Sequence, residues 1–172
     1  MAFLNDGQIM RIDKIIDRLN IQNDLNFPET SIIEAAKSLG ISLKIAKFKE
    51  DDIAGVLDYG EENKNPIIFV SELDSEKKRN FTIAHEIGHL LLHPNNGVRL
   101  KVDRHNFQNL TTKDITEEEA DYFAAALLTP AHKVKEIRFK SRMYEWDLIN
   151  FCSDYFNVSK SVIANRLKWI NP

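Results

Sequence analysis

The stretch that decides the fold is Arg79-Asn80-Phe81-Thr82-Ile83-Ala84-His85-Glu86-Ile87-Gly88-His89-Leu90-Leu91-Leu92-His93. It carries a His-Glu-x-x-His motif inside an otherwise apolar run. Residues four apart lie on the same face of an α-helix, so His85 and His89 can offer two imidazole nitrogens to one metal ion. Glu86 can reach a metal-bound water as a general base. The stretch therefore predicts a buried helix that carries a metal site.

Two histidines on one helix face also occur without a metal, as hydrogen-bonded groups of a core or a surface. The apolar neighbours favour a metal, because burying a histidine and a glutamate is costly unless they are ligated or hydrogen-bonded. The motif alone does not decide between these two interpretations. A third ligand elsewhere in the chain would decide it.

The composition is that of a globular protein with 172 residues, 43% hydrophobic and 28% charged, which is enough for one domain with its own core. The net charge of -3 does not indicate a nucleic-acid partner, although residues 131–172 hold twice as many basic as acidic side chains. The single cysteine, Cys152, excludes a disulfide within the chain. No apolar run approaches the ~18 residues of a membrane span, and the first residues lack a secretory signal. These observations fit a cytoplasmic protein or a mature form whose signal was removed, and we expect no membrane contact and a cytoplasmic location.

Hydrophobic periodicity predicts an α+β fold. Three short alternating runs in succession indicate a small, mostly antiparallel, three-stranded sheet packed on helices. The expected division is residues 1–130, with the sheet and the metal helix, and residues 131–172, a C-terminal helical extension packed on the first part. Residues 95–113 are polar and irregular. The predicted helices span 8–21, 28–39, 75–93, 117–128, 146–156 and 162–170, and the predicted strands span 41–48, 53–59 and 66–70.

Two helix starts are predicted from capping residues. Pro28 suits the first turn of the second helix, because its missing N–H needs no partner there. Thr116 suits the N-cap of the helix that follows the irregular segment, with Glu119 closing a capping box.

Histidines outside the motif are the first candidates for a third metal ligand. His93 follows His85 by eight residues, which is about 12 Å along a helix axis at 1.5 Å per residue, too far to join the same ion. We expect it to be a helix-end histidine or one that supports a ligand. His105 lies in the irregular segment, and nothing in the sequence supports it further.

Glu117 is the other candidate ligand. A helix that crosses the metal helix could present its carboxylate to the ion. Asp121, one turn later on the same face, could then accept a hydrogen bond from the non-ligating nitrogen of one histidine. Alternatively, Glu117 and Glu118 only stabilise a helix N-terminus through its dipole. Spacing alone leaves both interpretations open.

Two blocks of sequence together resemble the ImmA/IrrE family of metallopeptidases. The first is Phe81-Thr82-Ile83-Ala84-His85-Glu86-Ile87-Gly88-His89-Leu90-Leu91-Leu92-His93. The second is Glu117-x-Glu119-Ala120-Asp121-x-Phe123-Ala124-Ala125-Ala126-Leu127-Leu128-x-Pro130. The resemblance covers roughly residues 10–130. It implies a zincin-like fold, a zinc ion and Glu117 as the third ligand, with Asp121 where the family has Asn or Asp.

The resemblance also implies an activity, the hydrolysis of a peptide bond in a protein substrate. The expected substrate is a helix-turn-helix repressor of the XRE type, or an antitoxin, from a mobile element or a stress circuit. Glu86 would be the catalytic base. Manganese is compatible with the same His/His/Glu ligands. Candidates for stabilising the oxyanion are His105, Tyr122, His132 and Tyr144.

A second hypothesis is a metal-containing regulatory or DNA-binding module without peptidase activity. Residues 147–167 read as helix, short turn and helix, similar to a helix-turn-helix. Lys160, Arg166 and Lys168 could meet phosphates. Two helices that only pack on the core explain the same pattern, and no dense basic stripe is present.

Overall fold

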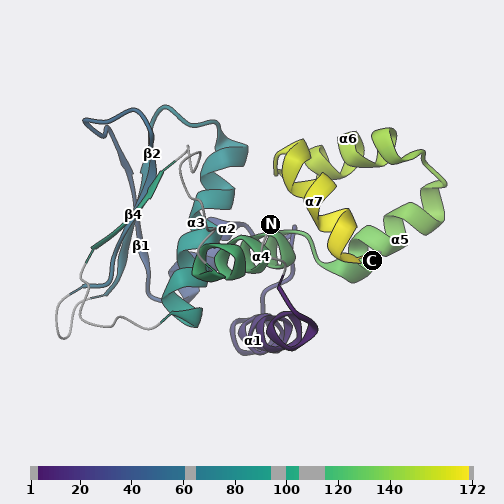
Figure 1. Ribbon diagram of the computed structural model, residues 1–172, viewed down its shortest axis with the longest axis horizontal. Helices are drawn as coiled ribbons and strands as arrows, with labels where there is room; N and C mark the ends of the chain where they lie inside the picture. Colours follow the sequence, from purple (N-terminus) through teal and green to yellow (C-terminus); the bar gives the residue numbers. More distant parts are fainter. Residues whose placement is uncertain (1–3, 61–64, 94–99, 105–114, 171–172) are drawn as a thin grey trace.

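The computed structural model describes residues 4–60, 65–93, 100–104 and 115–170. It confirms the α+β class: helices pack against one mixed sheet (Figure 1). No helix in these ranges is long and apolar enough to span a membrane. The elements are α1 Asp6–Asn23, α2 Ile32–Ser38, β1 Ser42–Ala46, β2 Ile53–Asp58, β3 Ile67–Ser71, α3 Glu76–Leu92, β4 Leu100–Arg104, α4 Ile115–Leu128, α5 Ala131–Ser141, α6 Glu145–Tyr155 and α7 Lys160–Ile170.

The sheet has four strands in the order β1-β3-β2-β4, not the three expected from the sequence. β1 runs parallel to β3, whereas β2 pairs antiparallel with both β3 and β4, so the sheet is mostly antiparallel. The additional strand, β4, lies in the segment that was expected to be irregular. It is an edge strand with an exposed Val102, and such a strand leaves little hydrophobic alternation to detect.

α3 packs against β2 and β3, and α2 packs against β1, so one face of the sheet is covered by helices (Figure 1). The buried side chains of the strands face this layer, among them Leu57, Ile68 and Val70. Gly55 in β2 determines how closely the sheet and α3 approach each other. A methyl group there would lie 2.6 Å from Cγ2 of Thr82 on α3. The strand therefore approaches the helix more closely than any other residue at position 55 would allow.

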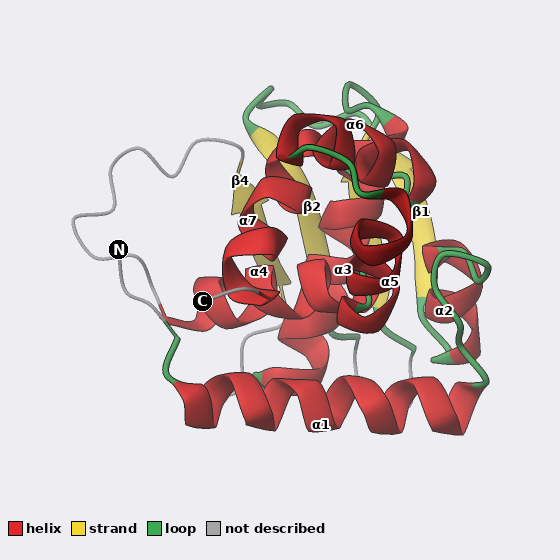
Figure 2. Ribbon diagram, turned by 90° about the vertical axis from the view of Figure 1, so that its right-hand side faces the viewer, coloured by secondary structure: helices red, strands yellow, loops and turns green. Residues whose placement is uncertain are grey.

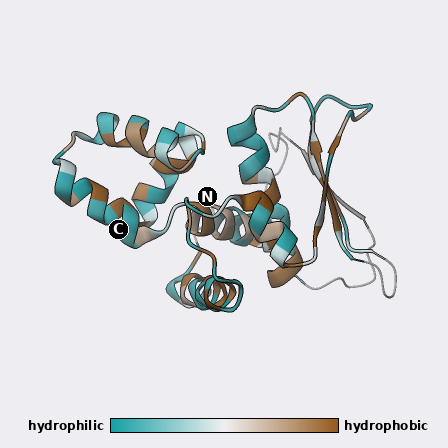
Figure 3. Ribbon diagram, turned by 180° about the vertical axis from the view of Figure 1, so that it is seen from behind, coloured by the Kyte–Doolittle hydropathy of each residue, from teal (hydrophilic) through white to brown (hydrophobic). Residues whose placement is uncertain are grey.

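α3 and α4 also pack closely against each other. A methyl group at Gly88 of α3 would lie 3.1 Å from Cδ1 of Phe123 and 3.3 Å from Cα of Ala120, both on α4. Ala120 and Ala124 are fully buried. Small residues at the contact thus bring the two backbones together. Figure 3 shows the hydrophobic stretches of both helices in the middle of the molecule.

α1 is a long helix that runs beneath the other helices (Figure 2). Its capping box joins Asn5 and Gln8, and its buried face includes Ile12 and Ile16. The expected start of the next helix at Pro28 is wrong. Pro28 lies in a turn, and α2 begins at Ile32, because Ser31 and Glu34 form a capping box there.

The C-terminal residues form three helices, of which α6 and α7 lie where the sequence predicts them. α5 lies where the sequence predicts no helix. Only one of its residues, Val134, is buried, so it lacks the apolar stripe that would reveal it. Lys77 of α3 bridges to Asp154 of α6 at 2.6 Å. Arg166 of α7 donates to the carbonyl of Thr129 at 3.2 Å. The division at residue 130 remains a prediction.

Candidate metal centre

His85 and His89 lie one turn apart on α3 and are 3% and 1% exposed. Their Nε2 atoms are 2.9 Å apart and point at the same space. α3 begins after Ser75, whose hydroxyl accepts from the Lys78 backbone N–H, and it continues to Leu92 without a break. The regular helix is what brings the two imidazoles together.

Glu117, in the first turn of α4, reaches the same space from the neighbouring helix. Its Oε2 lies 3.2 Å from Nε2 of His85, and its Oε1 lies 3.4 Å from Nε2 of His89. One ligand atom from each residue can be chosen so that all three lie within 4.8 Å of one another. The close α3–α4 contact at Gly88 makes this approach possible.

The start of α4 differs in detail from the prediction. The helix begins at Ile115, so Thr116 is inside it and is not its N-cap. Glu119 does not close a capping box. Its carboxylate pairs instead with the His93 ring and with the guanidinium of Arg11 on α1. These groups bind a carboxylate more strongly than the backbone N–H at the end of a helix does.

The donor set fits a divalent metal ion. Two imidazole nitrogens and one carboxylate oxygen converge from two rigid helices, and this is the usual protein ligand set of a catalytic zinc site with one position left open. Manganese accepts imidazole and carboxylate as well. His85, His89 and Glu117 therefore form a candidate metal site.

Glu86 is completely buried between α3 and the sheet. A methyl group at Gly55 would lie 3.4 Å from its Oε1, so β2 runs directly past the carboxylate. The side chain is one residue from His85 and is enclosed by strand and helix. Bulk water therefore does not reach this carboxylate.

Asp121 lies one turn after Glu117 on α4. Its Oδ1 is 3.0 Å from Nδ1 of His85. When Nδ1–H of the imidazole donates to this carboxylate, the lone pair of Nε2 faces the candidate metal position. The structure thus brings together the five residues that the sequence singled out for the site: His85, Glu86, His89, Glu117 and Asp121.

Of two further residues near the site, His93 lies as the sequence predicts and Tyr59 was missed. His93 was expected to end the helix or support a ligand, and its Nδ1 lies 3.0 Å from Nδ1 of His89. Tyr59, which follows β2, was not singled out at all. Burial raises the pKa of Tyr59, and the negative charges of Glu86 and Glu117 raise it further. Only the fold brings this tyrosine near both carboxylates, so no sequence signal could have found it.

Three of the four oxyanion candidates lie in the described part of the chain. Tyr122 donates to Asp13 of α1 at 2.9 Å. His132 lies on α5, and Tyr144 precedes α6 with 85% of its surface exposed. His105 lies outside the described residues.

Some of the basic side chains expected to contact phosphates are engaged in contacts within the protein. Arg166 is only 5% exposed and is bound to the Thr129 carbonyl, whereas Lys160 lies over the ring of Trp146. One of the expected phosphate-binding cations, Arg166, is therefore part of the packing of the C-terminal helices.

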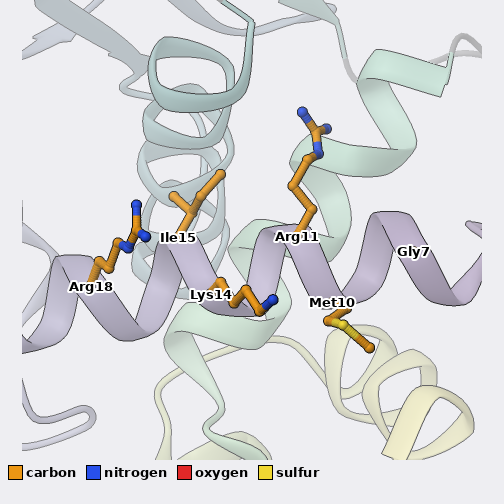
Figure 4. Close-up of a pocket in the computed structure, with 6 residues that line it drawn as sticks. All are labelled: Gly7, Met10, Arg11, Lys14, Ile15 and Arg18. Carbon is orange, nitrogen blue, oxygen red and sulfur yellow. The ribbon is translucent and has the colours of Figure 1, made fainter.

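A hollow of about 310 Å³ lies along α1 (Figure 4). It is formed by that helix alone and shares no residue with the metal ligands. The basic side chains that line it lie on the solvent-exposed face of α1. One of them, Arg11, also forms an ion pair with Glu119. The lining residues are Gly7, Met10, Arg11, Lys14, Ile15 and Arg18.

A His-Glu-x-x-His helix whose two histidines meet a glutamate from the following helix is the ligand arrangement of a metallopeptidase. The comparison with protein families agrees. The model of the IrrE N-terminal-like domain, Peptidase_M78, matches residues 36–168, and the chain belongs to this family of metallopeptidases. No curated protein matches the chain.

Proposed function

We propose that the chain is a zinc-dependent endopeptidase that hydrolyses a peptide bond in a protein substrate. The observation that carries the proposal is the convergence of His85, His89 and Glu117 beside the buried carboxylate of Glu86. Membership of a metallopeptidase family supports it. A purely structural metal site would not require a buried carboxylate next to the ligands.

His85, His89 and Glu117 would hold the ion. When bound, zinc supplies a Lewis acid that polarises the substrate carbonyl and lowers the pKa of a water molecule. The same donor atoms suit manganese, so the metal content of the purified protein is the measurement that identifies the ion.

Glu86 is the proposed general base. It takes a proton from the attacking water and delivers it to the leaving amine nitrogen. Burial between β2 and α3 keeps bulk water from competing for the carboxylate. Asp121 has a positioning role, because it holds the proton of His85 on Nδ1.

The proposed substrate is a helix-turn-helix repressor of the XRE type or an antitoxin, from a mobile element or a stress circuit. This part of the proposal rests on the resemblance of the two sequence blocks to the ImmA/IrrE family. A repressor is a cytoplasmic substrate, in line with the location expected from the sequence. Incubation with the repressor encoded beside the protein tests it directly, by the appearance of two fragments.

Glu86→Gln separates catalysis from metal binding. Because general acid–base catalysis contributes about 10²–10⁴-fold, we expect cleavage to fall by at least about 100-fold while the metal content is retained. His89→Ala should lose both. Glu145→Gln, the same change at an exposed residue of α6, is the matched control. Unchanged cleavage by Glu86→Gln would exclude the proposed mechanism.

A further inference from the structure

The two histidines of the candidate metal site are supported unequally. The imidazole of His85 is held by a direct contact, 3.0 Å from its Nδ1 to Oδ1 of Asp121 on α4. His89 is supported through another imidazole. Its partner is a third imidazole, that of His93, with the two Nδ1 atoms 3.0 Å apart.

The support of His89 continues beyond His93. Nε2 of His93 lies 3.0 Å from Oε2 of Glu119. Oε1 of Glu119 is 2.7 Å from the guanidinium of Arg11 and 3.3 Å from Nε2 of Gln8, both on α1. Gln8 is in turn fixed by its capping box with Asn5, through two bonds of 3.0 Å. The chain of contacts therefore ends at the start of the N-terminal helix.

The direction of each hydrogen bond follows from the role of His89. To offer the lone pair of Nε2 to a metal, its ring must carry the proton on Nδ1. That N–H donates to Nδ1 of His93, so His93 carries its own proton on Nε2 and donates it to Glu119. The ionised Glu119 accepts at both oxygens, and Arg11 balances its charge. Every donor in the chain has an acceptor.

We propose that His93, Glu119 and Arg11 form a positioning chain that fixes the orientation of the His89 ligand and couples α1 to metal affinity. The inference rests on the ligands named in the proposed function, but not on peptide hydrolysis. Arg11 and Gln8 precede residues 36–168, the part matched by the family model. α1 thus supplies support for the metal site from outside the matched part of the chain.

Loss of a group that orients a metal-bound histidine typically lowers metal affinity by 10–100-fold. We expect a loss of about this size for His93→Ala. Arg11→Met removes only the end of the chain, and its side chain is half exposed. It should fold normally and lose a smaller factor, about threefold to tenfold, because Gln8 still reaches Glu119.

The experiment is a competition between the protein and a chelator for Zn²⁺, together with the melting temperature of the metal-free protein. Arg11→Lys keeps a cationic donor and should restore most of the affinity. Lys14→Met, an exposed residue one turn further along α1, is the control and should bind Zn²⁺ like the wild type. A purely structural role of Arg11 would lower the melting temperature without changing the dissociation constant.

The outcomes separate the two proposals. If the wild type takes up no Zn²⁺, the proposed metal centre fails. If the wild type binds Zn²⁺ and both His93→Ala and Arg11→Met bind it equally well, the positioning chain is refuted and the metal centre stands. Should His93→Ala fail to fold, Arg11→Met and Arg11→Lys still decide the question.

Discussion

The α3–α4 pair and the C-terminal helices α5–α7 differ in the kind of side chain that they bury. In α3 and α4, charged and titratable side chains such as Glu86 and His89 are buried, and a glycine and alanines line the contact between the two helices. In α5–α7 the buried side chains are mainly apolar, while Phe139 and Tyr144 are 85% exposed. The first region is constrained by the chemistry it surrounds. The second is constrained mainly by the need to cover the core.

The largest expected effect comes from enlarging the α3–α4 contact. Gly88→Leu places a side chain where a single methyl would already lie 3.1 Å from Phe123. Overpacking of this kind typically costs about 1–3 kcal/mol, and here it also pushes Glu117 away from the histidines. We expect more than a tenfold loss of Zn²⁺ affinity, measured by chelator competition, and a lower melting temperature.

Leu91→Ala is the control for this change, since it alters a partly exposed residue of the same helix. It should leave the Zn²⁺ affinity unchanged. If Gly88→Leu also retained wild-type affinity, the close helix contact would have no bearing on the site.

The next effect concerns Arg166, which joins α7 to α4 and to the residue that follows it. Arg166→Met keeps the apolar stem but removes the hydrogen bond to the Thr129 carbonyl and the contact of the guanidinium with the Tyr122 ring, at 5.4 Å. We expect a loss of about 1–3 kcal/mol in the free energy of unfolding, because a buried carbonyl loses its partner. Zn²⁺ affinity should stay within about twofold of wild type, as expected for independent sites.

Urea titration of Arg166→Met beside Lys168→Met, an exposed cation two residues later, tests this expectation. A joint loss of stability and metal affinity in Arg166→Met alone would show that the two regions are not independent.

A smaller effect concerns alkaline stability. Burial raises the pKa of the Cys152 thiol on α6 from 9.0 to about 11. Between these two values the unfolded thiol loses its proton while the folded one keeps it, so stability falls as the pH rises above 9. Cys152→Ala should show a shallower fall in the free energy of unfolding between pH 8 and pH 10.5. Equal slopes in the two proteins would contradict the pKa difference.

The smallest effect is expected at the exposed aromatic side chains. Phe139→Ser changes a residue with 85% of its surface exposed, so the free energy of unfolding should change by no more than about 0.5 kcal/mol. A loss above about 1 kcal/mol by urea titration would mean that this ring packs against the protein after all.

The sequence was informative where local spacing determines the geometry. Two histidines one turn apart on an apolar helix specify their own meeting point, and Glu117 with Asp121 repeats the same spacing on α4. α5 and β4 escaped detection because they bury few side chains in a regular pattern. The start of α2 was misplaced because Pro28 fits a turn as well as a first helical turn.

The contribution of Glu119 and Arg11 to the support of His89 could not be predicted, for a different reason. Arg11 and Glu119 are 108 residues apart in sequence, and neither residue carries a local signal that names the other. Only the packing of α1 on α4 brings them together. Glu119 was assigned to a capping box because that rule uses sequence neighbours alone, whereas a carboxylate binds the strongest donors within reach.

The candidate ligands come from two helices that are separated by a long stretch of chain. An ion held between them would act as a cross-link, closing the loop from α3 to α4 much as a disulfide does. Because only the folded chain presents all three donor atoms, metal uptake would add directly to the free energy of folding, by an amount that grows with the ratio of free metal to its dissociation constant. A cell that withholds the metal would then remove both the activity and part of the protein's resistance to unfolding and proteolysis.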